Sequence, residues 1–140
     1  MRFVLDSNEY LFAFGVSKRP ASIALFDAIV GQPAAHTIRV PRLIIDEIRR
    51  NLPGDIFREV FTLIRGLTEI DEDFVVPFEL GTKYELAGLK PADAFIAAYS
   101  EWVAADYLVT ENRRFLTRHK DLPFRIGTAE QCLHLIKKTG

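Results

Sequence analysis

The stretch that decides the fold class is residues 91–110, PADAFIAAYSEWVAADYLVT. Its first fifteen residues are rich in alanine and apolar almost all round, which is typical of a helix packed against neighbours on several sides. Its last five residues, DYLVT, have the apolar and aromatic character of a short strand. A buried helix that leads directly into a strand is one step of an alternating α/β pattern.

The same alternation extends towards both ends of the chain. Short apolar runs predict further strands at residues 2–5, 36–40, 74–76 and 124–126. Apolar stripes at helical spacing predict further helices over residues 22–30, 41–52, 55–67 and 128–138. Asp55 is the expected N-cap of the third of these helices, and Thr128 with Gln131 forms a capping-box pattern at the start of the last.

Parallel neighbouring strands need crossover connections, and helices are the usual crossovers. The order of elements therefore predicts the α/β class, with a central parallel sheet covered by helices on both faces. The chain has 140 residues and contains no repeat or low-complexity linker, so we expect a single domain over residues 1–140.

The composition limits the kinds of partner, cross-link and compartment that we expect. With 18 basic and 19 acidic residues the formal net charge is −1, so any nucleic-acid binding must be local rather than spread over the whole surface. Cys132 is the only cysteine and the three histidines are scattered, which predicts neither a disulfide nor a zinc site. No uncharged apolar run approaches 18 residues, so we expect no membrane span and a cytoplasmic protein.

Acidic residues follow the predicted strands. Asp6 comes directly after the first strand, Glu47 projects inward from the helix after the second, and Asp93 lies in the first turn of the buried helix. Glu111 and Asn112 follow the DYLVT strand. Because ligands of parallel sheets collect at the carboxyl ends of the strands, we expect these side chains to converge.

Three converging carboxylates repel one another unless a cation compensates their charge. Mg²⁺ and Mn²⁺ are hard ions that take oxygen ligands and keep several waters, one of which can be oriented against a phosphodiester. Metal-dependent hydrolysis of a phosphodiester is therefore the hypothesis that these residues support.

Four segments carry a family resemblance that covers nearly the whole chain: VLDSN at 4–8, IIDEI at 44–48, KPADAFIAA at 90–98 and YLVTENRRFL at 107–116. In this order they resemble the motifs of PIN-domain proteins, including small VapC-type toxin ribonucleases. The resemblance implies a PIN-like three-layer α/β/α sandwich and a Mg²⁺- or Mn²⁺-dependent endoribonuclease that cuts RNA. It also implies the toxin component of a type II toxin–antitoxin pair, a cognate antitoxin and a homodimer.

The resemblance also implies roles for single residues. It assigns Asp6, Glu47 and Asp93 to the catalytic metal site, with Asn8 and Thr110 as polar supports. Two further candidates, Arg113 and Arg114, could bind RNA phosphates, because arginine donates in a planar fork.

The fourth catalytic position departs from the family pattern. Many members have an aspartate two residues after the last-motif threonine, whereas this chain has Asn112. An amide can hold a water but lacks the charge that helps to retain a second ion, so one or two metals remain open. Glu111 is an alternative source of that charge, although neighbouring residues at a strand end tend to point in opposite directions.

Simpler structural roles exist for each candidate. Asp6 could start a turn, Glu47 could pair along its helix with Arg50 or Asn51, and Asp93 could stabilise a helix dipole. The acidic run at residues 71–73 is most simply a solvated turn, and the aromatic residues of the 91–105 helix are most simply core.

The competing function is a catalytically weakened PIN-like module that binds RNA or a protein partner without cleavage, a reading motivated by Asn112 and the near-neutral charge. Other α/β enzymes fit less well. A P-loop or dinucleotide-binding protein needs a glycine-rich turn after the first strand, and DSNEYL contains no glycine.

Overall fold

The structure is a computed structural model that describes residues 1–15, 17–112, 115 and 121–139. Within them a five-stranded sheet has the order β3-β2-β1-β4-β5, and every neighbouring pair is parallel. Its strands are β1 (Arg2–Leu5), β2 (Thr37–Pro41), β3 (Glu69–Asp71), β4 (Tyr107–Val109) and β5 (Arg125–Gly127). The predicted α/β class with a central parallel sheet is therefore confirmed.

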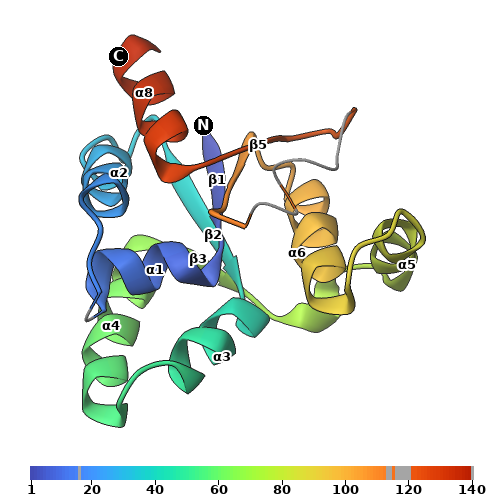
Figure 1. Cartoon of the computed structure of the whole chain (residues 1–140), viewed down its shortest axis with the longest axis horizontal. Coiled ribbons are helices and arrows are strands. Elements are labelled where there is room, and N and C mark those ends of the chain that lie inside the picture. The colour runs from blue at the N-terminus through green and yellow to red at the C-terminus, as the bar shows by residue number, and fades with distance from the viewer. Residues whose placement is uncertain (16, 113–114, 116–120, 140) are drawn as a thin grey trace.

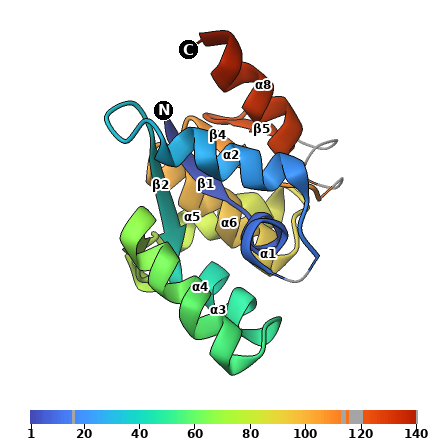
Figure 2. The ribbon, with the colours of Figure 1, turned by 90° about the vertical axis from the view of Figure 1, so that its left-hand side faces the viewer.

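Helices supply the crossovers from β1 to β2, from β2 to β3 and from β3 to β4. The described helices are α1 (Ser7–Phe14), α2 (Pro20–Val30), α3 (Arg42–Arg50), α4 (Gly54–Leu67), the 3₁₀ helix η1 (Asp73–Val75), α5 (Phe78–Leu86), α6 (Pro91–Trp102) and α8 (Ala129–Thr139). Figures 1 and 2 show α1 and α2 on one face of the sheet, α5 and α6 on the other, and α3 and α4 beyond one end. No helix in the described ranges is both long and apolar enough to cross a membrane.

The core is built around the central strand β1. Its residues Phe3, Val4 and Leu5 are completely buried, since helices cover both faces of the sheet. Helix α6 contributes a second run of buried small and aromatic side chains, and it ends where Ala104 takes a left-handed backbone with φ 54°. The predicted burial of the 91–105 region is thus observed for α6, although Trp102 keeps 38% of its surface exposed.

The region between residues 69 and 86 was predicted wrongly. The strand lies at Glu69–Asp71 rather than at residues 74–76, because the 3₁₀ helix η1 occupies Asp73–Val75, and Phe74 is 85% exposed. Asp71 is not in a solvated turn, because both its oxygens accept from Arg39 and Tyr99 also donates to it. The ion pair with β2 fixes this acidic edge strand, and charge alone had suggested a loop.

Further differences between the predicted and the observed elements concern the N-termini of helices. Helix α1 was missed because the residues after the first strand predicted no helix and Asp6 was considered as the start of a turn, whereas Asp6 caps a helix there. Asp55 is not an N-cap, since Pro53 holds that position and Asp55 lies inside the first turn of α4. The Thr128–Gln131 capping box is confirmed by reciprocal bonds of 3.1 and 2.9 Å.

Candidate functional site

An open, polar cavity of about 340 Å³ lies at the carboxyl ends of β1 and β4. It is lined by Asp6, Ser7, Asn8, Glu47, Asn51, Ala92, Asp93, Ile96, Glu111 and Asn112. The structure thus brings the three acids expected at a metal site, together with Asn8 and Asn112, to one place. The simplest local roles of these acids do not explain their convergence from α1, α3 and α6.

Asp6 is held by hydrogen bonds on both carboxylate oxygens. Its Oδ1 accepts from the Ser7 backbone N–H at 2.8 Å, which caps α1, and its Oδ2 accepts from Thr110 Oγ1 at 2.9 Å. Only 8% of Asp6 is exposed. Burial raises the pKa of Asp6 and the nearby charge of Asp93 raises it further, while the donors from Ser7 and Thr110 oppose the increase.

Glu47 reaches the cavity from α3. Its Oε2 accepts from Ser7 Oγ at 3.1 Å, whereas its Oε1 is buried and has no hydrogen-bond partner among the described residues. Burial raises the pKa of Glu47, and the negative charges of Asp6 and Asp93 add to this effect. A buried carboxylate oxygen without a donor is costly, so Glu47 Oε1 is suited to a cation or a water that fills the cavity.

Asp93 is positioned by the start of α6. Pro91 occupies the first turn of the helix, and Asp93 follows in the same turn with its side chain half-buried. The helix N-terminus favours a carboxylate there, as the simpler reading expects. The same residue also lines the cavity and acts electrostatically on Asp6 and Glu47, so a role for Asp93 at the helix terminus leaves room for the predicted role at the site.

Thr110 and Asn112 connect the end of β4 to the acids. Thr110 is completely buried and does not line the cavity, but its hydroxyl donates to Asp6 and accepts from the Asn112 backbone N–H at 3.0 Å. This bridge fixes the direction of the chain after β4, and Asn112 lines the cavity. The predicted RNA-binding residues, Arg113 and Arg114, lie outside the described residues.

Glu111 lines the same cavity as Asn112, contrary to the expectation that the two neighbours would diverge. Its Oε2 accepts from the Ala129 backbone N–H at 3.3 Å, at the start of α8. The chain therefore presents a fourth carboxylate beside the position where the family motif has an aspartate.

Glu9 is a buried acid near the site that was not predicted from the sequence. It is fully buried in α1, and its Oε1 accepts from Ser22 Oγ at 3.2 Å while its Oε2 has no partner among the described residues. Burial, followed by the charge of Glu111, raises the pKa of Glu9 to about 7. The spacing from Asp6 to Glu9, an N-cap acid followed by a glutamate three residues later, was the available signal.

The acids offer only hard oxygen ligands, which suit Mg²⁺ or Mn²⁺ better than a softer metal. Across the described ranges, no three acidic, histidine or cysteine side chains are close enough together to grip a metal ion on their own. The donor set therefore suits an ion that keeps several waters, as Mg²⁺ usually does.

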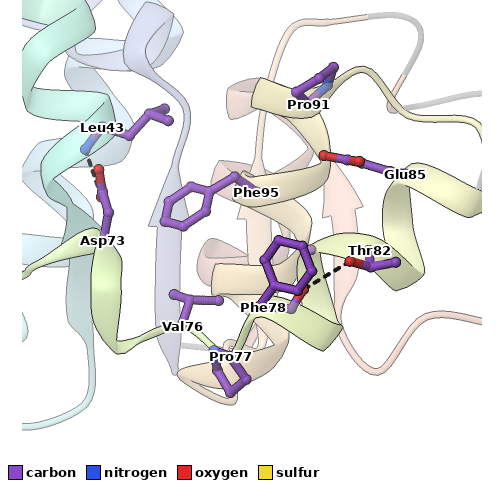
Figure 3. Close-up of a pocket in the computed structure, with 10 residues that line it drawn as sticks. Leu43, Asp73, Val76, Pro77, Phe78, Thr82, Glu85, Pro91 and Phe95 are labelled. Atoms are coloured by element: carbon purple, nitrogen blue, oxygen red, sulfur yellow. Dashed lines mark hydrogen bonds between the residues drawn. The ribbon is translucent and has the colours of Figure 1, made fainter.

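A second, larger cavity of about 420 Å³ lies between η1, α5 and α6. Figure 3 shows Phe95 and Phe78 directed towards it, with Val76 and Pro77 below. Asp73 at its edge already accepts from the Leu43 backbone N–H at 2.9 Å. This apolar groove gathers no cluster of reactive groups, so the smaller polar cavity is the candidate site.

Comparison with known proteins gives structural likeness only. The chain matches no protein-family model and no curated protein. A chain of the crystal structure of VapBC2 from Rickettsia felis, bound to a DNA fragment from their promoter, has a TM-score of 0.68 at 17% identity, covering 91% of this chain and 98% of that chain. A chain of the crystal structure of FitAcB from Neisseria gonorrhoeae has a TM-score of 0.61 at 13% identity, covering 91% and 97%.

These comparisons correct the family assignment. Identities of 17% and 13% show a shared fold, and no family model supports the four sequence motifs. The assignment to the PIN-domain family, among small VapC-type toxins, is therefore wrong as a statement of membership. What the comparisons support is a PIN-like fold over most of the chain.

Proposed function

We propose that this protein is a metal-dependent endoribonuclease that hydrolyses RNA phosphodiester bonds. The observation that carries the proposal is the convergence of Asp6, Glu47 and Asp93 from three separate elements on one polar cavity at the carboxyl edge of a parallel sheet. Burial and the repulsion among the acids raise the pKa values of Asp6 and Glu47. Such shifts are typical of functional sites.

Mg²⁺ or Mn²⁺ is the proposed cofactor, and Asp6, Glu47 and Asp93 would hold it. The unpartnered Oε1 of Glu47 and the all-oxygen donor set support this choice. When bound, such an ion offsets the repulsion of the acids and lowers the pKa of a water.

The chain's own residues would orient the reactants. Thr110 and Ser7 fix the direction of the Asp6 carboxylate through the bonds to its two oxygens, and Ser7 also fixes Glu47. The side-chain amides of Asn8 and Asn112 could donate to phosphate oxygens or hold a water beside the acids. Arg113 and Arg114 remain the proposed phosphate-binding residues, as the sequence predicted.

The biological setting that we propose is a toxin–antitoxin pair, with this chain as the toxin. The two structural neighbours come from VapBC and FitAB systems, whose toxin components are ribonucleases. In this setting the partners would be the RNA substrate, an antitoxin protein and a second copy of the chain. The support is likeness of fold, combined with the acidic cavity.

The test is a cleavage time course on a mixed single-stranded RNA pool in Mg²⁺, in Mn²⁺ and in chelator. We expect cleavage with either ion, no cleavage in chelator, and a loss of about 100-fold or more in Asp93→Asn, the size seen when a group that stabilises transition-state charge is removed. The exposed Asp27 on α2 supplies the matched control, Asp27→Asn, which should cut at the wild-type rate.

The rival function is binding of RNA or a protein partner without cleavage. It is favoured by Asn112 at the fourth position and by the absence of a closed three-ligand cluster from the described part of the chain. A folded, partner-free protein that binds the RNA pool equally with and without chelator, and cuts it in neither ion, would replace the nuclease with this module.

A further inference from the structure

Arginine and phenylalanine side chains form a continuous ladder on the hairpin of α3 and α4. The Cζ of Arg49 lies 5.3 Å from the centroid of the Phe57 ring, and Phe57 stacks on Phe61 with centroids 5.5 Å apart and planes inclined by 17°. The Cζ of Arg65 then lies 5.8 Å from the Phe61 centroid. We name these four residues the Arg–Phe ladder.

Helical spacing produces the ladder. Phe57, Phe61 and Arg65 are four residues apart along α4 and therefore share one face, while Arg49 reaches over from the last turn of α3. The arginines are exposed and the two rings are half-buried, so part of each ring remains accessible. Figure 2 shows this hairpin extending away from the sheet at the bottom of the molecule.

The ladder and the candidate site are linked through the turn between α3 and α4. Glu47 and Arg49 both lie on α3 but are two residues apart, so their side chains point to different faces of the helix. Asn51, which caps the end of α3, lines the acidic cavity. Arg50 lies close enough to act electrostatically on Glu47. A strand of nucleic acid held at the cavity would reach the ladder by passing the turn between α3 and α4 at Asn51.

The chemistry of the ladder matches single-stranded nucleic acid. Guanidinium groups donate to phosphate oxygens, and aromatic rings provide faces on which bases stack. The hairpin also carries a small excess of positive charge in a chain of net charge −1. It has five arginines, Arg42, Arg49, Arg50, Arg58 and Arg65, against four acids, Asp46, Glu47, Asp55 and Glu59. Asp46 lies 3.6 Å from Arg49, but both side chains are about half exposed, so solvent weakens that pair.

We propose that the Arg–Phe ladder binds the single-stranded RNA that flanks the bond held at the acidic cavity. The inference rests on the proposed function for the identity of its ligand. The arginines hold the backbone, and a base that displaces a guanidinium from the outer face of Phe57 or Phe61 stacks in its place. The surface therefore selects unpaired RNA over duplex, whose bases are already stacked.

The test is fluorescence anisotropy with a labelled single-stranded RNA pool in chelator, so that binding is measured without cleavage. Arg49→Gln/Arg65→Gln should weaken binding about tenfold or more at moderate salt and reduce the slope of log affinity against log salt by about 1.4, because two phosphate contacts are lost. Phe61→Leu should weaken binding about fivefold or more and leave the salt slope unchanged, since it removes a stacking face and no charge.

The matched control is Arg19→Gln, because Arg19 also lies over a ring, 3.9 Å from the Phe12 centroid, but between α1 and α2. It should change affinity less than twofold. Unchanged binding in all ladder variants, or an equal loss in Arg19→Gln, overturns the proposal and leaves the arginines as covers for half-buried rings. Binding that depends on the ladder without any cleavage in Mg²⁺ or Mn²⁺ supports the ladder and refutes the nuclease.

Discussion

Thr110 is the residue on which the geometry of the site depends most closely. Its buried hydroxyl both donates to Asp6 Oδ2 and accepts from the Asn112 N–H, so it ties β1 to the chain after β4. Thr110→Val keeps the shape but removes both bonds. We expect it to lower the free energy of unfolding by about 2 kcal/mol, as for a bond to a charged group, and to slow cleavage.

Urea unfolding and the cleavage assay check this prediction. The control is Thr82→Val, which removes a hydroxyl that donates only to a backbone carbonyl on the surface of α5. Equal stability and equal cleavage in Thr110→Val and wild type would show that the bridge does not organise the site.

Glu9 should make stability depend on pH. Its folded pKa of about 7 lies above the ordinary value of 4.5, so between these values the folded state holds a proton that the unfolded state releases. Stability should therefore fall as pH rises from 4.5 to 7, by at most on the order of 3 kcal/mol, and then level off. Asp6 and Glu47 contribute slopes of the same sign, because burial raises their pKa values too.

Glu9→Gln should flatten this dependence without abolishing it. The measurement is the free energy of unfolding at pH 5, 6, 7 and 8 in chelator, for wild type and variant. If the two profiles have the same slope across that range, Glu9 is not a source of the pH dependence.

The residues of the candidate site were predictable from the sequence where their position at the end of a strand or on the inner face of a helix determined where they lie. Asp6 follows a strand, and helical periodicity places Glu47 on the inner face of its helix. Their convergence with Asp93 could therefore be expected from the sequence. Glu9 could not be found in this way, because its burial depends on α1, a helix that the sequence did not predict. The burial of a residue can be predicted from the sequence only when the helix that carries it is also predicted.

Among the elements, β5 packs closely at Gly127 against both β4 and the start of α8. A Cβ there would lie 2.2 Å from the Tyr107 hydroxyl and 2.8 Å from Gln131 Oε1, the acceptor of the capping box. Gly127→Ala must displace one of these groups, so we expect a loss of about 1 to 3 kcal/mol in unfolding free energy.

Gly66→Ala is the opposite case and the matched control. A Cβ at Gly66 meets nothing within 4 Å and the residue lies in α4, so alanine should stabilise by about 0.5 to 1 kcal/mol. Thermal unfolding of both variants tests the pair. Equal effects at the two positions would mean that β5 and α8 pack more loosely than the structure has them.

Elements with strong periodicity were predictable, and those fixed by tertiary contacts were not. The stripes of α3 and α4 and the all-round apolar α6 gave helices close to their observed bounds. Helix α5 buries only Tyr84 completely and carries no clear stripe, and β3 is an acidic strand that Arg39 ties to β2. Both were missed because local pattern does not record such partners.

In the molecule as a whole, the acidic cavity and the Arg–Phe ladder have different roles in the proposed activity. The cavity gathers carboxylates that a cation would neutralise, and the ladder on the hairpin of α3 and α4 exposes the arginines that we propose bind RNA. The net charge of −1 does not reveal that acids gather at the cavity and arginines on the ladder, because this distribution depends on the fold.

The most direct test of the central claim is Mn²⁺ binding, followed by electron paramagnetic resonance of the free ion, in wild type, Asp93→Asn and Asp27→Asn. We predict saturable binding in wild type and Asp27→Asn, and an affinity at least about tenfold weaker in Asp93→Asn, because a charged oxygen ligand becomes a neutral amide. Equal Mn²⁺ binding in all three proteins, or none in any, would contradict a metal site built from Asp6, Glu47 and Asp93.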